Sequence, residues 1–181
     1  PGKRGKTTVV DRDECVRPES TMETLGRLPT AFEPDGVCTA GNSSPMSDGA
    51  GAVVLMDRET AEKKGLEPLA VFRGFAVTGC DPSIMGVGPV EAIRKVLRKT
   101  GLTLEEMDLI ELNEAFATQS IACIRELGLD MDKVNVNGGA LALGHPLAGT
   151  GAILTAKLLY ELKRRRARYG LVAFCMAGGQ G

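Results

Sequence analysis

The sequence predicts an α/β fold in which a β-sheet carries helices on both faces. Short apolar runs alternate along the chain with segments that repeat apolar residues at helical spacing, and this alternation is typical of sheets covered by helices. Hydrophobic residues make up 43% of the 181 residues, while aromatic residues contribute only 4%. We therefore expect one α/β domain over 36–181, with a largely aliphatic core.

The first 35 residues form a segment of different character. They are charged, interrupted by prolines and only weakly periodic, which is typical of a loop-rich segment that packs on another part of the protein. The sequence begins with Pro1 rather than with methionine. We therefore expect residues 1–35 to be a connecting segment within a longer protein.

Three elements are expected between residues 50 and 79. The apolar run AGAVVLM over 50–56 predicts a short strand, and LAVFRGFAVTG over 69–79 predicts a longer one. Between them, RETAEKKG over 58–65 predicts a helix that ends at its glycine, because glycine readily adopts the left-handed conformation that closes a helix.

Two helices and a strand are expected over residues 90–128. VEAIRKVLRKTG over 90–101 places apolar residues on one helical face and ends at a glycine, and DLIEL over 108–112 predicts a buried strand. Between them, Thr103 followed by Glu106 predicts a capping box. NEAFATQSIACIRELG over 113–128 then predicts a helix that again ends at a glycine.

The last elements follow a glycine-rich segment over 135–152. Leu154, Leu158 and Leu162 repeat at helical spacing and predict a third long helix, and YGLVAFC over 169–175 predicts a final strand. The only histidine of the chain, His145, lies among the glycines of that segment. Glycines are used where the backbone turns sharply or approaches something closely, so the histidine is expected to occupy a defined position.

Charge and cysteine content exclude several functional classes. The 22 basic and 23 acidic side chains give a net charge of -1, so neither nucleic acid nor a membrane surface is expected as a partner. The five cysteines are odd in number and scattered without a CxxC pair, so neither a disulfide framework nor a metal site is indicated. A reducing, cytoplasmic location is the simplest expectation.

Three loops carry the candidate chemistry. Asn113 follows the strand over 108–112, His145 precedes a helix, and Cys175 ends the last strand. Ligands of α/β sheets bind beyond strand ends, and a thiol beside an imidazole indicates acyl transfer at a carbonyl. Each residue also has a structural alternative: Asn113 as a helix N-cap, His145 as a hydrogen-bonded core residue, and Cys175 as a small hydrophobic residue.

Taken together, the motifs resemble the C-terminal half of the thiolase family. The match consists of Asn113-Glu114-Ala115-Phe116, Gly144-His145-Pro146, Cys175-x-x-Gly178-Gly179, Ala40-Gly41-Asn42-Ser43-Ser44, Ser47-Asp48-Gly49, Gly79-Cys80-Asp81-Pro82, Met85-Gly86-x-Gly88-Pro89 and Asn137-Gly138-Gly139. This resemblance covers essentially the whole chain. It implies a mixed β-sheet with helices on both faces, places residues 1–35 at the end of the thiolase loop region, and leaves the final strand, expected after Gly181, missing.

The resemblance also implies an activity and site residues. Thiolases cleave a 3-ketoacyl-CoA with CoA to acetyl-CoA and a shortened acyl-CoA, or run the condensation in reverse; CoA is a substrate, and no cofactor is permanently bound. By resemblance, His145 activates the nucleophilic cysteine and forms an oxyanion hole with a water held by Asn113. Cys175 corresponds to the acid/base cysteine, and the backbone N–H of Ala177 to a second oxyanion hole. Positions lining the pantetheine channel correspond to Ser44 and Phe116.

The chain departs from the family pattern in three places. Ala177 stands where glycine is usual, and in Leu147-Ala148-Gly149-Thr150-Gly151 the usual glycine and small residue are exchanged, with threonine replacing serine. The cysteine that becomes acylated belongs to the N-terminal half of the family and matches none of Cys15, Cys38, Cys80 and Cys123. We therefore expect the isolated chain to be inactive. Its expected partners are CoA thioesters, the N-terminal thiolase half, further copies in a dimer or tetramer, and a hydratase/dehydrogenase subunit.

Several functional alternatives remain open. The motif CDPSIMG followed by GPV resembles the degradative 3-ketoacyl-CoA thiolases of fatty acid β-oxidation. Within the family, the alternatives are a biosynthetic acetoacetyl-CoA thiolase and a 3-oxoadipyl-CoA thiolase. In a different class, the chain is a non-catalytic CoA- or acyl-binding protein or a structural half. The presence of Asn113, His145 and Cys175 together argues against this last class.

Overall fold

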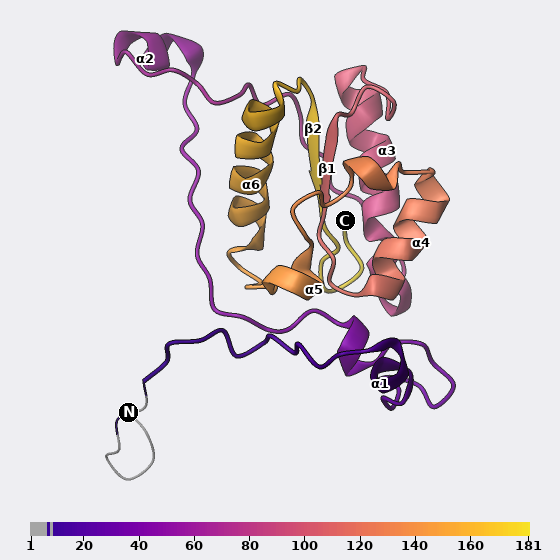
Figure 1. Cartoon of the computed structure of the whole chain (residues 1–181). Helices are drawn as coiled ribbons and strands as arrows, with labels where there is room; N and C mark the ends of the chain where they lie inside the picture. Colours follow the sequence, from indigo (N-terminus) through magenta and orange to yellow (C-terminus); the bar gives the residue numbers. More distant parts are fainter. Residues whose placement is uncertain (1–6, 8) are drawn as a thin grey trace.

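A parallel pair of strands lies at the centre of the structure, a computed structural model that describes residue 7 and residues 9–181. Strand β1 (Leu109–Leu112) pairs with β2 (Gly170–Ala173). Helices α3 (Gly88–Thr100) and α4 (Ala117–Leu127) lie on one side of this pair, and α6 (Thr150–Arg165) lies on the other (Figure 1). The predicted α/β class with helices on both faces is confirmed.

The core divides into two clusters because alternate side chains of β1 point to opposite faces of the sheet. Ile110 and Leu112 pack against the α3 and α4 side, whereas Leu109 packs against α6. The first cluster includes Val90, Ile93 and Cys123, and the second includes Leu158 and Leu162. Burial of these side chains fixes the strand pair between its helices and so fixes where the strand ends lie.

The predicted helices form, and glycines end them as expected. Helix α2 (Arg58–Lys63) is followed by Gly65, α3 by Gly101 and α4 by Gly128, with φ angles of 64°, 69° and 65° in the left-handed region. The capping box predicted at Thr103 and Glu106 opens no helix. Only the hydrogen bond from Thr103 N to Glu106 Oε2 forms, at 2.8 Å, and it closes a turn.

The two strands predicted over 50–56 and 69–79 do not form, so both predictions are wrong for this chain. The first segment runs extended toward α2, and its apolar side chains are exposed, from 41% at Met56 to 81% at Val54 (Figure 1). A strand requires a neighbour about 4.8 Å away to pair with. Among the described residues, these segments have no such neighbour along most of their length. Neither segment therefore forms a strand, although its sequence pattern favours one.

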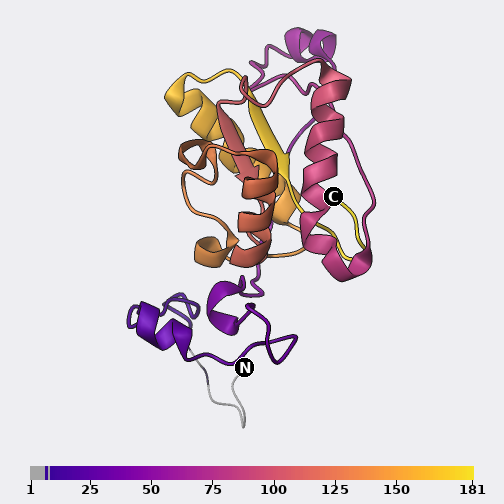
Figure 2. The same ribbon diagram turned by 90° about the vertical axis from the view of Figure 1, so that its right-hand side faces the viewer.

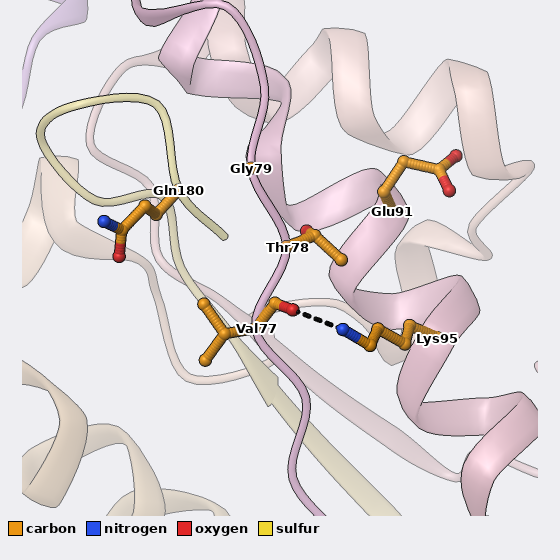
Figure 3. A pocket seen from close by; sticks show the side chains of 6 residues that line it. All are labelled: Val77, Thr78, Gly79, Glu91, Lys95 and Gln180. Atoms are coloured by element: carbon orange, nitrogen blue, oxygen red, sulfur yellow. Dashed lines mark hydrogen bonds between the residues drawn. The ribbon is translucent and has the colours of Figure 1, made fainter.

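A hollow of about 640 Å³ lies beside the second of these segments, lined by Val77, Thr78, Gly79, Glu91, Lys95 and Gln180 (Figure 3). Lys95 Nζ donates to the carbonyl of Val77 at 2.8 Å, and Lys99 Nζ donates to that of Phe75 at 3.2 Å. On the other edge, Thr78 exchanges two backbone hydrogen bonds with Gly181, at 3.0 and 3.1 Å. The hollow contains none of the predicted site residues.

Residues 9–47 lie to one side of the α/β unit in both views (Figures 1 and 2). It contains helix α1 (Met22–Gly26) and the 3₁₀ helix η2 (Ala40–Asn42), joined by turns and loops. Residues 1–6 and 8 of the predicted connecting segment fall outside the described residues. No helix within the described residues is both long enough and apolar enough to cross a membrane.

The remaining short helices lie in the loops of the α/β unit. They are η3 (Pro82–Val87), η4 (Met131–Lys133) and α5 (Ala140–Leu143). Helix α5 connects the Asn-Gly-Gly segment to His145 and therefore matters for the site.

Candidate active site

Asn113 occupies the first position after β1, where the strand pair ends. Its backbone N–H donates to the carbonyl of Ala173 at 2.8 Å, so it continues the ladder to β2, and the residue is only 2% exposed. Helix α4 begins at Ala117 with Phe116 as its N-cap residue. The alternative in which Asn113 caps this helix is therefore wrong, and its amide is free to contact other groups.

His145 is the partner of that amide. Its Nε2 lies 3.3 Å from Asn113 Nδ2, and its Nδ1 lies 2.8 Å from Thr150 Oγ1, the hydroxyl of the first residue of α6. Its backbone N–H donates to the carbonyl of Pro45 at 3.1 Å. The ring is thus held on both nitrogens, and its backbone is held by the segment that follows Ser44.

Gly144 is required to bring His145 to this place. Its φ of 86° lies in the left-handed region, and a Cβ there would collide with the hydroxyl of Ser47. Residues other than glycine avoid such a φ because of the clash of Cβ with the backbone. The Gly-His-Pro pattern therefore encodes a close crossing between this loop and residues 45–47.

The partners of His145 define its protonation state. An amide NH₂ donates only, so Nε2 beside Asn113 is an acceptor, and Nδ1–H then donates to Thr150. Burial lowers the pKa of His145 below its ordinary value, because desolvation disfavours the imidazolium. At neutral pH the ring is consequently a free base with its lone pair on Nε2.

Cys175 lies at the same edge of the sheet. It follows β2 by two residues, beyond the Ala173 carbonyl that binds Asn113, and is 8% exposed. Burial raises the pKa of its thiol, and the neighbouring Cys80 raises it further. The thiol is therefore protonated at neutral pH. The structure joins Asn113 to His145 directly, whereas Cys175 shares with them only the same end of the strand pair.

Ser44 and Phe116 lie in neighbouring segments of the structure. The backbone N–H of Ser44 donates to the carbonyl of Ala115 at 2.9 Å, and Ser43 bridges to Phe116. Phe32 packs edge-on against Phe116, with ring centroids 5.8 Å apart and planes at 80°. Phe32 could not be identified from the sequence, since an isolated aromatic residue in a loop gives no signal of a partner 84 positions away in the chain.

Two of the sequence departures have structural explanations. Ala177 is exposed and does not adopt a positive φ, unlike Gly178 and Gly179 at 85° and 81°, so its Cβ introduces no backbone strain. At Gly149, a Cβ would lie 3.0 Å from the carbonyl oxygen of Gly49, so the exchanged glycine permits a close approach. Thr150, which replaces the usual serine, holds His145 through its hydroxyl.

Potential metal ligands do not cluster in the described part of the chain. Within residue 7 and residues 9–181, no group of three or more histidine, cysteine, aspartate and glutamate side chains is placed to hold a metal ion. The polar groups that the structure gathers at the site are the amide of Asn113, the imidazole of His145, the hydroxyl of Thr150 and, at the neighbouring strand end, the thiol of Cys175.

Two family models match this chain. The model described as "Thiolase, C-terminal domain" matches residues 66–181, and the one described as "Thiolase, N-terminal domain" matches residues 1–59. The chain belongs to the thiolase family. The resemblance inferred from the motifs is confirmed.

Thiolases of known sequence are similar to this chain along nearly all of its length. Identity is 57% over 176 residues to the 3-ketoacyl-CoA thiolase of Bacillus subtilis (strain 168), and 52% over 179 residues to the mitochondrial 3-ketoacyl-CoA thiolase of Homo sapiens. An acetyl-CoA acetyltransferase of Chromobacterium violaceum is 49% identical. These alignments cover at least 97% of the chain but only 45–46% of each relative, so this thiolase chain spans less than half of their length.

Solved thiolase structures share the fold. Human mitochondrial 3-ketoacyl-CoA thiolase superposes with a TM-score of 0.89 at 53% identity, covering 93% of this chain and 43% of that one, and one of its structures is a complex with CoA. The acetyl-CoA acetyltransferase of Bacillus anthracis gives a TM-score of 0.91 at 49% identity, covering 100% and 46%. The fold of this chain is therefore that of part of a thiolase.

Proposed function

We propose that this chain supplies His145, Asn113 and Cys175 to the active site of an acyl-CoA acetyltransferase that cleaves a 3-ketoacyl-CoA with CoA. The observation that carries the proposal is the pair of contacts on His145, with Asn113 Nδ2 at 3.3 Å from Nε2 and Thr150 Oγ1 at 2.8 Å from Nδ1. They present a neutral imidazole base at the edge of the sheet, where the thiol of Cys175 also lies.

In the first half-reaction, Nε2 of His145 takes the proton of a nucleophilic cysteine supplied by the complementary half. The thiolate attacks the C3 carbonyl of the substrate, and the C2–C3 bond breaks with its electron pair passing to the acetyl thioester as an enolate. Cys175 S–H donates its proton to the enolate carbon, and acetyl-CoA leaves. The raised pKa of the buried Cys175 thiol keeps this proton in place at neutral pH.

In the second half-reaction, the Cys175 thiolate takes the proton of the incoming CoA thiol. The CoA thiolate attacks the acyl-enzyme carbonyl, and the nucleophilic cysteine leaves with the shortened acyl-CoA released. The departing cysteine thiolate takes back the proton held by Nε2 of His145, and Cys175 keeps the proton of the CoA thiol, so the enzyme finishes in its starting state.

The same contacts support a proposal for how the enolate is stabilised. Once Nε2 carries a proton, it becomes a donor, and with a water held by the Asn113 amide it is placed to bind the enolate oxygen. Preorganised donors at a developing oxyanion are worth about 3–4 kcal/mol each. The backbone N–H of Ala177 is proposed to serve the second oxyanion hole, which its unstrained backbone permits.

The CoA thioester is proposed to pass along the wall formed by Ser44 and Phe116. Phe32, which packs on Phe116 and is 71% exposed, extends this apolar surface. One structure of the human mitochondrial thiolase contains CoA, which supports CoA as the substrate carrier here. No permanently bound cofactor is invoked in either half-reaction.

The degradative direction is favoured, with fatty acid β-oxidation as the setting. Identity is 57% to a 3-ketoacyl-CoA thiolase and 49% to an acetyl-CoA acetyltransferase, which supports the 3-ketoacyl substrates. Biosynthetic acetoacetyl-CoA and 3-oxoadipyl-CoA thiolases are the alternatives within the family. A cytoplasmic location, a dimer or tetramer of the complete protein and association with a hydratase/dehydrogenase subunit are parts of the same proposal.

The isolated chain is proposed to lack thiolase turnover, because none of its other cysteines contacts the base in the described hydrogen bonds. Cys38 lies 3.0 Å from Thr118 Oγ1, and Cys123 donates to the carbonyl of Gly86 at 3.4 Å. The exposed apolar side chains over 50–56 support a complementary half as the missing partner.

The test begins with the intact mass of the native source protein, followed by thiolysis assays with acetoacetyl-CoA and a long-chain 3-ketoacyl-CoA. A mass about twice that of this chain, with activity on the long substrate, is expected. In that protein, His145→Ala and Cys175→Ser should each lower kcat by about 10²–10⁴-fold. Full turnover by the 181-residue chain would overturn its inactivity. Unchanged turnover in both variants would overturn the assigned roles and favour the non-catalytic CoA-binding alternative.

A further inference from the structure

A buried ion pair connects β1 to α6 outside the reacting groups. Glu111, in the middle of β1, is 2% exposed, and its Oε2 lies 2.7 Å from Lys157 Nζ on α6. This oxygen receives no hydrogen bond of regular geometry, and burial raises the pKa of the carboxyl. The core cluster on this face, Leu109, Leu158 and Leu162, is apolar, and the nearby carboxylate of Glu161 raises the pKa of Glu111 further. A buried pair of this kind contributes little stability over an apolar pair, so its presence requires another explanation.

Lys157 has a second contact, and it leads toward the active site. Its Nζ donates to the carbonyl of Gly138 at 2.6 Å. One turn further along α6, the side chain of Asn137 lies close enough to Glu161 to help lower the pKa of its carboxyl. Two consecutive residues of the Asn-Gly-Gly segment thus lie against one face of α6, and a hydrogen bond holds Gly138 there.

The β1 side holds the same segment. Asn135, with a φ of 48°, accepts from the backbone N–H of Leu112 at 3.0 Å and donates to the carbonyl of Leu112 at 2.7 Å. Glu114 accepts from the backbone N–H of Leu141 at 3.1 Å at the start of α5. The path from Gly138 to His145 is therefore short and anchored, running through α5 and Gly144.

Lys157 is connected to the three segments that hold the ring of His145 in place: β1, the start of α6 and the segment that begins at Gly138. Glu111 precedes Asn113 by two residues on β1, so the two side chains share a face of the sheet. Thr150, which binds Nδ1 of His145, lies two turns before Lys157 at the start of α6. Gly138 leads to His145 itself.

We propose that Lys157 is a positioning residue whose ammonium group, held by Glu111, fixes the Gly138 carbonyl and thereby keeps Nε2 of His145 on the Asn113 amide. The neighbouring Glu161 and Asn135 contacts hold the ends of the same segment. This inference rests on the proposed role of His145 as the base, but its first test does not require turnover.

The first test uses NMR of the 181-residue chain, in which His145 is the only histidine and gives one set of ring signals. Lys157→Met should change the tautomer populations reported by the ring nitrogens and shift the pKa of His145 toward its ordinary value. Lys157→Arg, which keeps a cationic donor, should restore most of the wild-type signal. Lys163→Met, an exposed lysine on the same helix, is the matched control and should leave His145 unchanged.

A double variant separates the effect of losing the Gly138 contact from a general loss of folding. Lys157→Met leaves Glu111 buried without its cation, whereas Glu111→Leu with Lys157→Met removes both charges and should fold well. If the proposal is correct, the tautomer populations and the pKa of His145 are still altered in this double variant, because no ammonium group holds the Gly138 carbonyl. A stable double variant with a wild-type His145 titration and tautomer would overturn it.

Turnover of the protein completed with its N-terminal half supplies the second readout. Lys157→Met should lower kcat by about 10²-fold with little change in KM, as expected for a base displaced by about 1 Å. If Lys157→Met lowers stability but leaves kcat unchanged, the ion pair of Glu111 with Lys157 is merely structural. If His145→Ala itself leaves turnover intact, the proposed function fails, while the NMR experiment still decides whether Lys157 positions the ring.

Discussion

The chemistry attributed to His145 depends on which ring nitrogen carries the proton. A donor amide at 3.3 Å from Nε2 and a hydroxyl at 2.8 Å from Nδ1 select the tautomer with its lone pair toward Asn113. Burial disfavours the charged ring and acts in the same direction. A base that is neutral near pH 7 can accept a thiol proton, which is the property the proposed reaction requires.

Replacing Asn113 by aspartate should favour the protonated form of His145 over the neutral form. A buried carboxylate beside Nε2 favours the imidazolium, so Asn113→Asp should raise the pKa of His145 by about 1–3 pH units. An NMR titration of the single histidine measures this directly. Ser20→Asp adds the same charge on an exposed residue of the N-terminal region and should leave the titration in place. A His145 pKa that is the same in Asn113→Asp and wild type would show that the two side chains are not in contact in solution.

Elements matter to the site chiefly through the loops that connect them. Helix α5 is only four residues long, and the close crossing at Gly144 continues its path to His145. Helix α6 begins with Thr150 against the ring and ends with basic residues around a buried acid, so one helix spans from the active site to the far end of the domain. The geometry of the site is therefore coupled to the stability of these elements.

Gly144→Ala should destabilise the chain by about 1–3 kcal/mol, since alanine at positive φ is strained and its Cβ meets Ser47. Thermal or urea unfolding measures the change in free energy. At Gly26, which ends α1, an added Cβ would have nothing within 4 Å and the φ is not positive, so Gly26→Ala is the matched control. Equal stability of the two variants would contradict the close crossing.

Acid sensitivity is expected at the C-terminal end of α6. Glu161 is 4% exposed and binds Arg164 and Arg165; these contacts, with Asn137, lower its pKa from 4.5 to about 2. Because the folded-state pKa is depressed, the contribution of this carboxylate to stability is present above pH 4.5 and is lost as the pH falls toward about 2.

Glu161→Gln should therefore reduce the loss of stability between pH 5 and pH 3, measured by urea unfolding at both values. The exposed pair of Glu59 with Lys63 supplies the control, and Glu59→Gln should leave the pH dependence nearly unchanged. The same pH dependence in Glu161→Gln and wild type would mean that other carboxylates are responsible.

At the scale of the whole molecule, extended apolar segments lie at the margins of a small sheet. Residues 69–77 carry exposed Val71, Phe72 and Phe75, while lysines from α3 cover carbonyls on one edge. Exposed strand-forming segments are interaction surfaces or aggregation sites in water. We attribute them to surfaces that a complementary part of the thiolase covers.

Hydrogen exchange should separate the paired from the unpaired segments. Amides of β1 lie in the ladder and the core, so they should exchange far more slowly than those over 70–76, which lack backbone partners among the described hydrogen bonds. Thr78, bound to Gly181, is the internal control and should be intermediate. Mass spectrometry after deuterium labelling checks this order, and uniform protection over 66–112 would contradict the arrangement.

Much of the fold could be predicted from local patterns. Gly65, Gly101 and Gly128 end helices as expected, and the leucines at 154, 158 and 162 identify α6, because helix periodicity and the conformational freedom of glycine are properties of neighbouring residues. The strands over 50–56 and 69–79 could not be decided this way. A strand forms only beside another strand, and the pattern of residues within a segment does not specify which strand that is.

The sequence by itself determined the α/β class, helices α2, α3, α4 and α6, the thiolase family and the choice of Asn113, His145 and Cys175 as candidate site residues. Only the tertiary structure decided that Asn113 faces His145 rather than capping α4, that Thr150 holds the other ring nitrogen, and that Lys157 reaches Gly138. The physical reason is the distance along the chain over which each kind of information acts. Residue types and spacing report local conformation and chemistry, whereas contacts between residues 5 to 32 positions apart depend on how the loops close over the ends of the strands.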